Sequence, residues 1–366
     1  MNEINYYLKL KYFSMKKLKC MVNQVRDDLP VNKRFEITYS RNFTLSLSNF
    51  CKNFCSYCYY NHRIPKRENI KNIELLDEKH IDETIKLAKQ LNCKEGLIVS
   101  GEKPDDFPIV RKKLKERGYE NYLEFVVHVC KKLLKSSILP HTNIGNLSFK
   151  ELELLKEYNA SMGLMLESTS SKLMKKGKVH FNSPSKFPNN RLNHIENAGR
   201  LKIPFTTGLL IGIGENFKDR IKDLILIREL NEKYGHIQEV IIQNFVFKEG
   251  INYKPKKPIN IKDMLKLVGI ARIIFQNEIA IQVPPNLING HERNFLEMGI
   301  DDFGGISPLT LDYINPEKSW PQIKHLENIC LENGYFLKER LPIYDKFIKK
   351  EGFVSETIKK TLDVFK

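Results

Sequence analysis

A repeated alternation of short apolar runs with amphipathic segments narrows the possible folds of this chain more than any other feature. A first β-rich run spans residues 43–47, and further runs follow at 96–100, 138–142, 161–166, 205–211, 239–245 and 280–283. Between them, apolar residues recur at helical spacing, as in Ile81, Ile85 and Ala88. Such alternation predicts an α/β fold with a parallel sheet inside a layer of helices. About six to eight strand–helix units favour a TIM-type (βα) barrel that is closed or nearly closed.

The positions of these runs predict the boundaries of the barrel. Residues 1–36 precede the first strand and are interpreted as an N-terminal extension, and residues 37–305 form the barrel. Prolines and later helical patterns predict a C-terminal cap over residues 306–366. Two helix starts are also predicted: Ser148 and Glu151 have the spacing of a capping box, and Asn216 suits an N-cap.

Composition limits the classes of partner. The 366 residues include 60 Lys and Arg against 44 Asp and Glu, which gives a net charge of +16. These charges are scattered in doublets such as Lys175-Lys176 and Lys256-Lys257, whereas nucleic-acid-binding proteins gather them on one face or tail. No apolar run approaches the ~18 residues of a membrane helix, and the lysine-rich N-terminus lacks the apolar core of a secretory signal. We therefore expect a cytoplasmic protein with no membrane or nucleic-acid partner.

Three of the seven cysteines, Cys51, Cys55 and Cys58, lie on a predicted loop just after the first strand. An odd number of cysteines in a chain expected to be cytoplasmic argues against a disulfide framework. The spacing C-x3-C-x2-C can bring three thiolates to one centre, but no second pair follows to complete a usual zinc site. A 4Fe-4S cluster normally takes four cysteines, so three would leave one iron open for a substrate.

Three alternatives for these cysteines stay open. The trio could be a zinc knuckle completed by His62, it could be three structural thiols, or one of the isolated cysteines could add a fourth ligand and close the site. The isolated cysteines are Cys20, Cys93, Cys130 and Cys330.

The motif C-x3-C-x-Tyr-C after a strand resembles the signature of the radical S-adenosylmethionine (SAM) enzymes, with Tyr57 as its aromatic member. The resemblance implies a 4Fe-4S cluster held by Cys51, Cys55 and Cys58, whose open iron is chelated by the methionine end of SAM. Electron transfer from the cluster would then cleave the sulfonium and release a 5'-deoxyadenosyl radical. In barrels the chemistry lies at the carboxyl ends of the strands, and the cysteine loop falls at such an end.

Two further segments resemble SAM-binding positions of this superfamily. Ser100-Gly101-Glu102 ends a strand where these enzymes commonly place Gly-Gly-Glu, whose backbone meets the amino group of SAM. The stretch 208–215, GLLIGIGE, resembles the motif G-x-I-x-G-x-x-E. That motif implies that the backbone near Ile211 and Gly212 lies along the adenine and that Glu215 belongs to the same cofactor site.

Polar side chains near other strand ends predict the rest of the cofactor site. Glu167 closes a strand, and its carboxylate could hold ribose hydroxyls or the amino group of SAM. Arg191 could pair with the methionine carboxylate, which its planar guanidinium suits. Gln243 and Asn244 end another strand and can read imide or amide edges through paired donors and acceptors. Because these side chains converge on one barrel mouth, we expect several of them to be functional.

Longer stretches resemble one family in particular, the CofG-type 7,8-didemethyl-8-hydroxy-5-deazariboflavin (FO) synthases, over roughly residues 37–330. They are residues 39–45, 139–145, 159–167, 198–208, 235–240 and 301–308, followed by Asn315-Pro316 and Trp320-Pro321. The resemblance implies that a tyrosine–ribitylaminouracil adduct, made by a companion CofH-type subunit, loses a hydrogen atom to the radical. The adduct then cyclises and releases ammonia, which yields FO, 5'-deoxyadenosine and methionine. An electron donor is implied as a further partner.

The motifs do not identify the groups that move protons. We take His141, Glu167 and Asp302 as candidates, because a base must reach its proton within ~2.6–3.2 Å or through one water. Two other interpretations of the function stay open. One is another small-molecule barrel-type radical SAM enzyme, such as one on the futalosine route to menaquinone. The other is a basic iron–sulfur or zinc protein that binds RNA without radical chemistry.

Overall fold

The computed structural model describes residues 3–65 and 72–365. Residues 1, 2 and 366, at the ends of the predicted extension and cap, lie outside the described residues, as do residues 66–71. Eight parallel strands form a barrel, and it is closed because β1 pairs with both β2 and β8. The predicted TIM-type barrel is therefore confirmed. The barrel strands are β1 (Glu36–Ser48), β2 (Glu95–Ser100), β3 (Leu139–Asn143), β4 (Ser161–Gly163), β5 (Phe205–Ile211), β6 (Ile237–Asn244), β7 (Ala280–Gln282) and β8 (Asp302–Ile306).

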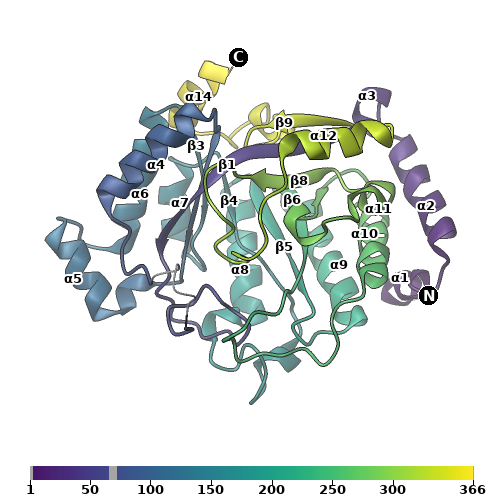
Figure 1. Cartoon of the computed structure of the whole chain (residues 1–366), viewed down its shortest axis with the longest axis horizontal. Helices are drawn as coiled ribbons and strands as arrows, with labels where there is room; N and C mark the ends of the chain where they lie inside the picture. Colours follow the sequence, from purple (N-terminus) through teal and green to yellow (C-terminus); the bar gives the residue numbers. More distant parts are fainter. Residues whose placement is uncertain (1–2, 66–71, 366) are drawn as a thin grey trace.

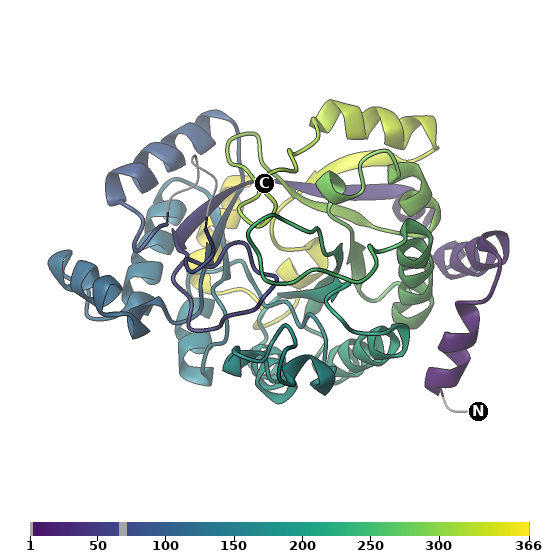
Figure 2. The same cartoon turned by 60° about the horizontal axis from the view of Figure 1, so that its bottom comes forward.

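Helices surround these strands, as Figures 1 and 2 show. Two predicted helix starts are confirmed: Ser148 and Glu151 form a capping box, and Asn216 accepts a hydrogen bond from the Asp219 N–H. The helices are α1 (Glu3–Leu10), α2 (Met15–Asp27), α3 (Val31–Arg34), α4 (Glu78–Gln90), α5 (Pro108–Glu116), α6 (Tyr122–Lys135), α7 (Phe149–Lys156), α8 (Pro188–Arg200), α9 (Phe217–Tyr234), α10 (Ile261–Phe275), α11 (Glu292–Glu297), α12 (Ile323–Glu332), α13 (Asp345–Ile348) and α14 (Glu356–Leu362).

A ninth strand, β9 (Phe336–Arg340), lies beside the barrel and pairs in parallel with the first part of β1. β1 is 13 residues long, so its first part contacts β8 and β9 while Asn42–Ser48 pairs with β2. The sequence patterns predict neither β8 nor β9 as a strand. β8 contains two consecutive glycines and β9 is mostly charged, and both compositions are poor in strand-forming side chains.

The strand predicted over residues 161–166 is shorter in the structure, where β4 ends at Gly163. Glu167 has a φ of 64°, in the left-handed region, so the chain cannot continue as a regular strand through it. The Leu166 N–H donates to the Thr207 hydroxyl at 3.2 Å instead of to a backbone carbonyl. This break turns the Glu167 carboxylate toward the end of the barrel that carries the cysteine loop.

The two terminal segments pack on different parts of the barrel (Figure 1). α1 and α2 lie against α9 and α10, and Arg228 of α9 forms an ion pair with Glu3 at 2.5 Å. After β9, apolar residues of α13 and α14 share a small core with Leu139 and Ala160, at the amino ends of β3 and β4. The C-terminal segment therefore closes the end of the barrel opposite the cysteines. No helix within the described ranges is long and apolar enough to cross a bilayer.

Candidate active site

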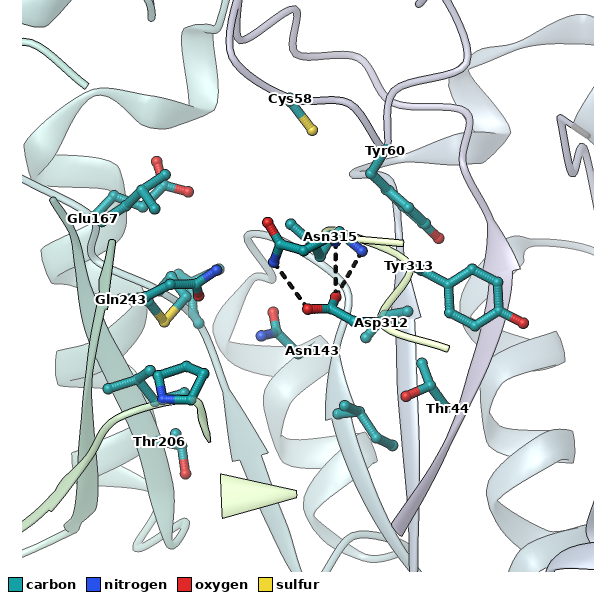
Figure 3. Close-up of a pocket in the computed structure, with 18 of the residues that line it drawn as sticks. Thr44, Cys58, Tyr60, Asn143, Glu167, Thr206, Gln243, Asp312, Tyr313 and Asn315 are labelled. Carbon is teal, nitrogen blue, oxygen red and sulfur yellow. Dashed lines mark hydrogen bonds between the residues drawn. The ribbon is translucent and has the colours of Figure 1, made fainter. Parts of the chain in front are cut away.

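A cavity of about 400 Å³ opens at the carboxyl ends of the strands and extends down into the barrel. Figure 3 shows Cys58 and Glu167 at one end of this cavity and Thr206 deeper inside. Most of the predicted site residues line the cavity. These residues are Cys51, Cys55, Tyr57, Cys58, Ser100, Gly101, Glu102, His141, Glu167, Arg191, Gln243 and Asn244. The structure does not bring Ile211, Gly212, Glu215 and Asp302 into the cavity lining.

Backbone hydrogen bonds hold the cysteine loop over the barrel mouth. The Phe54 N–H donates to the Asn182 carbonyl at 2.9 Å, and the Cys58 N–H donates to the Cys55 carbonyl at 3.0 Å. The Cys51 thiol sulfur accepts from the Glu102 N–H at 3.2 Å, so β2 also supports the loop. All three cysteines are free thiols on the cavity wall.

The thiols need a positive centre to ionise. Burial raises the pKa of Cys51, Cys55 and Cys58, and the neighbouring cysteines raise that of Cys58 further, to about 12. A bound metal centre reverses this effect, because its charge stabilises thiolates. Within residues 3–65 and 72–365, no three His, Cys, Asp or Glu side chains converge on a point where one ion could bind. A cubane does not need that convergence, since each thiolate bonds a different iron, so the trio fits a cluster better than a single zinc.

His62 does not complete a zinc site in this structure. Its ring stacks on Phe50 with centroids 4.1 Å apart and an angle of 6° between the planes. Its Nδ1 lies 3.4 Å from the Cys51 N–H. The ring therefore supports the loop by stacking, and one ring nitrogen faces the backbone of Cys51.

The isolated cysteines lie away from the cavity. Cys20 is exposed on α2, and Cys93 and Cys130 face the Asn42 carbonyl and the Thr142 hydroxyl in the core. Cys330 is buried on α12. None of these four lines the cavity, so the structure offers no fourth cysteine ligand there.

The Ser100-Gly101-Glu102 segment packs directly under the cysteine loop. A Cβ atom on Gly101 would lie 2.1 Å from the Phe50 carbonyl oxygen, so only glycine allows this approach. The Glu102 carbonyl accepts from the Lys52 N–H at 2.9 Å, and its carboxylate accepts from the Asn146 N–H at 3.1 Å. The segment thus joins the cysteine loop to the loop after β3.

Glu167 is the centre of a buried hydrogen-bond cluster. Its carboxylate accepts from Tyr57 and Lys186, and His180 Nε2 lies 3.2 Å away. Burial alone would raise its pKa, but Lys186, His180 and Arg191 together hold that pKa well below its usual range. Glu167 is therefore an anion at the cavity wall, fixed by groups from the cysteine loop and the segment before α8.

Besides Asn42 Oδ1 deep in the barrel, two buried polar atoms at the cavity wall lack a hydrogen-bond partner among the described residues. They are Nε of Arg191, on α8, and Oδ1 of Asn244, at the end of β6. A buried polar atom without a partner costs free energy unless a ligand supplies one. This donor and this acceptor therefore fit a ligand that offers an anionic group to Arg191 and a hydrogen-bond donor to Asn244.

The turn after β5 is braced by Glu215 rather than open to the cavity. Its carboxylate accepts from the N–H groups of Gly212 and Ile213 at 2.7 and 2.9 Å, and from Arg220 Nε at 2.8 Å. Ile211 is fully buried in the core. Glu215 therefore sets the shape of this turn through its backbone.

His141 and Asp302 lie deeper in the barrel. Ser161 donates its only hydroxyl proton to the Pro342 carbonyl, so His141 Nδ1, 2.7 Å from that hydroxyl oxygen, must donate to it. Nε2 is then the unprotonated nitrogen, and burial lowers the pKa of His141 to about 3. Asp302 begins β8 at the opposite end of the barrel and is paired with Arg340 Nη2 at 2.9 Å.

Sequence reasoning missed several residues of the cavity wall. Tyr60, Lys186 and Lys248 contribute polar groups, and the loop after β8 contributes Asp312 and Asn315 (Figure 3). The aromatic run around the cysteines could have indicated Tyr60, and the Asn315-Pro316 stretch could have indicated that loop. No local pattern marks the two lysines, because they reach the site only through tertiary packing.

The chain is similar to known proteins in sequence and in fold. The radical SAM superfamily model matches residues 45–227. A protein of Methanococcus vannielii named 7,8-didemethyl-8-hydroxy-5-deazariboflavin synthase is 47% identical over 90% of this chain and 92% of its own length. One of the same name from Methanothermobacter thermautotrophicus is 43% identical over 89% of this chain and 97% of its own.

Two solved structures share the fold. The FeFe-hydrogenase maturase HydG from Carboxydothermus hydrogenoformans superposes with a TM-score of 0.70 at 17% identity, over 93% of this chain and 79% of its own. Methylornithine synthase (PylB) superposes with a TM-score of 0.67 at 20% identity, over 92% of this chain and 94% of its own. At these identities the structures support the barrel architecture alone.

Proposed function

The chain belongs to the radical SAM superfamily and, within it, to the family of 7,8-didemethyl-8-hydroxy-5-deazariboflavin synthases, and from this premise we infer its reaction. It converts 5-amino-5-(4-hydroxybenzyl)-6-(D-ribitylimino)-5,6-dihydrouracil and SAM to FO, 5'-deoxyadenosine, methionine and ammonia. The observation that carries this function is the 47% identity over nine-tenths of the chain, which includes the cysteine loop and every barrel strand.

A 4Fe-4S cluster and SAM are the cofactor and co-substrate that we propose for this cavity. Cys51, Cys55 and Cys58 would hold the cluster, since they are free thiols on one cavity wall. Arg191 would bind the carboxylate of SAM, because its buried Nε lacks a partner among the described residues. Together the bound groups supply a 5'-deoxyadenosyl radical, which is the kind of chemistry that cofactors bring to a protein.

We propose that Glu167 and Arg191 belong to one part of the cavity wall that binds SAM, called here the SAM-binding wall. We also propose that His141 accepts a proton or hydroxyl hydrogen from the substrate. His141 suits an acceptor because its Nδ1 is committed to Ser161 and its Nε2 is unprotonated. Gly163 leaves room for it, since a Cβ there would lie 2.9 Å from Nε2. Asp302 is the weakest of the three candidate bases, because Arg340 already holds it as an ion pair.

Three segments that meet near Cys55 form a basic surface, called here the rim around Cys55, and this surface favours an acidic electron donor. Residues 49–65, 168–195 and 250–262 contain no Asp or Glu. Ser56 joins the three segments, because its N–H donates to the Val179 carbonyl and its carbonyl accepts from the Tyr253 N–H, both at 3.0 Å. The rim carries the exposed lysines Lys175, Lys176, Lys178, Lys254, Lys256 and Lys257. Complementary charge guides protein partners together, so we propose that the electron donor docks here and that a companion CofH-type subunit supplies the adduct.

Anaerobic reconstitution with iron and sulfide, followed by dithionite, SAM and the adduct, tests the function. We expect one FO and one 5'-deoxyadenosine for each adduct consumed. Cys55→Ala should lose the cluster absorbance and both products together. The substitution removes one of the three thiolates proposed to bind the cluster, and the buried alanine that takes its place has no atom that can bind iron. Cys330→Ala is the matched control, since Cys330 is buried on α12 outside the cavity lining, and it should keep both products. SAM cleavage without any FO would contradict the proposed reaction.

A further inference from the structure

The floor of the cavity is a layer of polar side chains deep inside the barrel. Barrel interiors are usually filled at this depth by branched apolar side chains. Here six polar residues are buried from bulk solvent and yet line the cavity. The floor layer consists of Asn42, Glu95, His141, Thr206, Glu239 and Gln282.

Neighbouring strands bring these side chains to one level. Asn42 of β1 is paired with Glu95 of β2, and Thr206 of β5 is paired with Glu239 of β6. The Thr206 hydroxyl donates to Glu239 at 3.3 Å. The Gln282 amide nitrogen, turned toward Glu239, lies 3.0 and 3.1 Å from its two carboxylate oxygens. Thr206, Glu239 and Gln282 therefore form one hydrogen-bonded group, and Asn42, Glu95 and His141 present further polar atoms to the same part of the cavity.

Arg340 closes the barrel beneath this layer and leaves no positive charge for a ligand. Its Nε donates to Asp302 at 2.5 Å, its Nη1 donates to the Leu341 carbonyl at 3.1 Å, and its Nη2 donates to Glu239 at 2.9 Å. Each guanidinium nitrogen is thus engaged by the protein. Burial raises the pKa of Glu95 and of Glu239. With no free cation beside them, a phosphate or carboxylate ligand would find no counter-charge there. The floor layer suits a neutral ligand that both donates and accepts hydrogen bonds.

Between the floor layer and the cysteines, one part of the wall is apolar, and Thr44 and Asn143 add polar groups beside it. Leu97, Leu164, Ile241 and Pro284 line the cavity at this middle height. A ligand that fills the whole cavity would therefore have a hydrogen-bonding tail and a flat, less polar body above it.

We propose that the floor layer is the subsite for the ribityl chain of the substrate, and this rests on the proposed function. A ribityl chain is a neutral polyol whose hydroxyls each donate and accept, which matches amide, carboxyl, imidazole and hydroxyl partners. The heterocycle would lie against the apolar wall, with its reacting carbon toward the cysteines. Unlike the SAM-binding wall, the floor layer would recognise the substrate alone.

Binding of FO and of its counterpart with N10-methyl in place of ribityl tests this subsite. Both are measured by deazaflavin fluorescence anisotropy on the anaerobically reconstituted protein without reductant. We expect the wild type to bind FO at least tenfold more tightly, since two or more hydrogen bonds to the polyol contribute. Thr206→Val and Gln282→Met should reduce that ratio to below threefold without weakening the methyl compound. Thr84→Val on α4, buried outside the cavity lining, is the matched control and should leave the ratio unchanged.

A wild type that binds both compounds equally, or folded floor variants that keep the tenfold ratio, would overturn the proposal. The wild-type comparison needs no substitution, so it holds even if a variant fails to fold. Turnover separates this failure from a failure of the proposed function. A wild type that forms FO but shows no preference for ribityl refutes the subsite alone, whereas one that forms no FO refutes the function.

Discussion

Single buried polar atoms indicate how this cavity binds its ligands. Most buried polar groups in the barrel find partners, so a donor without one is informative. Arg191 presents such a donor from α8, and Glu167 beside it is already bonded to Tyr57 and Lys186. Arg191 therefore offers this wall a buried donor that lacks a partner among the described residues, and the proposed SAM carboxylate would accept from it.

Replacing Arg191 with Met should weaken SAM binding about tenfold or more, because it removes a hydrogen bond between charged groups. Iron and sulfide content should stay at the wild-type level, since Arg191 does not bind the cluster. Equilibrium binding of SAM to the reconstituted protein measures the change. Arg200→Met is the control on the same helix, because that side chain is 54% exposed. Equal SAM affinity in wild type and Arg191→Met would show that the carboxylate binds elsewhere.

The turn between β5 and α9 shows how one element supports the site without lining it. Glu215 accepts from two backbone N–H groups of the turn, and Arg220 from the first part of α9 holds the carboxylate in place. Gly212 has a φ of 99°, which the turn requires and which favours glycine. The backbone near Ile211 and Gly212 is therefore rigid where the resemblance places the adenine.

Replacing Glu215 with Gln should raise the KM for SAM about fivefold, because one oxygen acceptor and the ion pair to Arg220 are lost and the turn loosens. The cluster absorbance should not change. Steady-state formation of 5'-deoxyadenosine gives the KM. Asn216→Ala in the same turn removes the N-cap of α9, which costs about 1 kcal/mol of stability but should leave the KM unaltered. An unchanged KM in Glu215→Gln would mean that the turn does not contact SAM.

At the scale of the whole molecule, the C-terminal segment completes the barrel. β9 lies outside the ring, yet its last residue, Arg340, reaches under the floor layer and joins Asp302 of β8 to Glu239 of β6. The side chains of Asp302 and Glu239 are 0% and 5% exposed, so each depends on this single cation. The predicted cap at residues 306–366 therefore contributes to the barrel interior as well as covering its end.

Replacing Arg340 with Met should lower the free energy of unfolding by about 3–5 kcal/mol, because two buried carboxylates lose their partner. Urea denaturation followed by circular dichroism measures this loss. The double variant Arg340→Met/Asp302→Asn should recover part of it. Lys338→Met is the control on β9: its side chain is half exposed and its partner Glu36 keeps a second ion pair with Lys33, so the loss should stay below about 1 kcal/mol. A similar small loss in Arg340→Met would show that the floor does not need this charge.

Local patterns were sufficient for the features that depend on neighbours in the chain. The spacing of Cys51, Cys55 and Cys58 indicated the cysteine loop, and apolar periodicity indicated the strands that became β1 to β7. Capping residues such as Ser148 fixed helix starts, because a cap acts within one turn of the chain. The scattering of lysines along the sequence did not predict a basic surface, because folding brings several of them together on the rim around Cys55.

The sequence by itself determined the α/β barrel, the thiol trio at a strand end and the family of the chain. Only the tertiary structure decided which polar residues share a wall. Asp302 was a candidate base in the sequence, but closure of the barrel places it at the far end, bonded to Arg340, 38 residues away. The same guanidinium reaches Glu239 across 101 residues. Such contacts arise from the stagger and closure of eight strands, and no pattern over a few neighbouring residues can encode them.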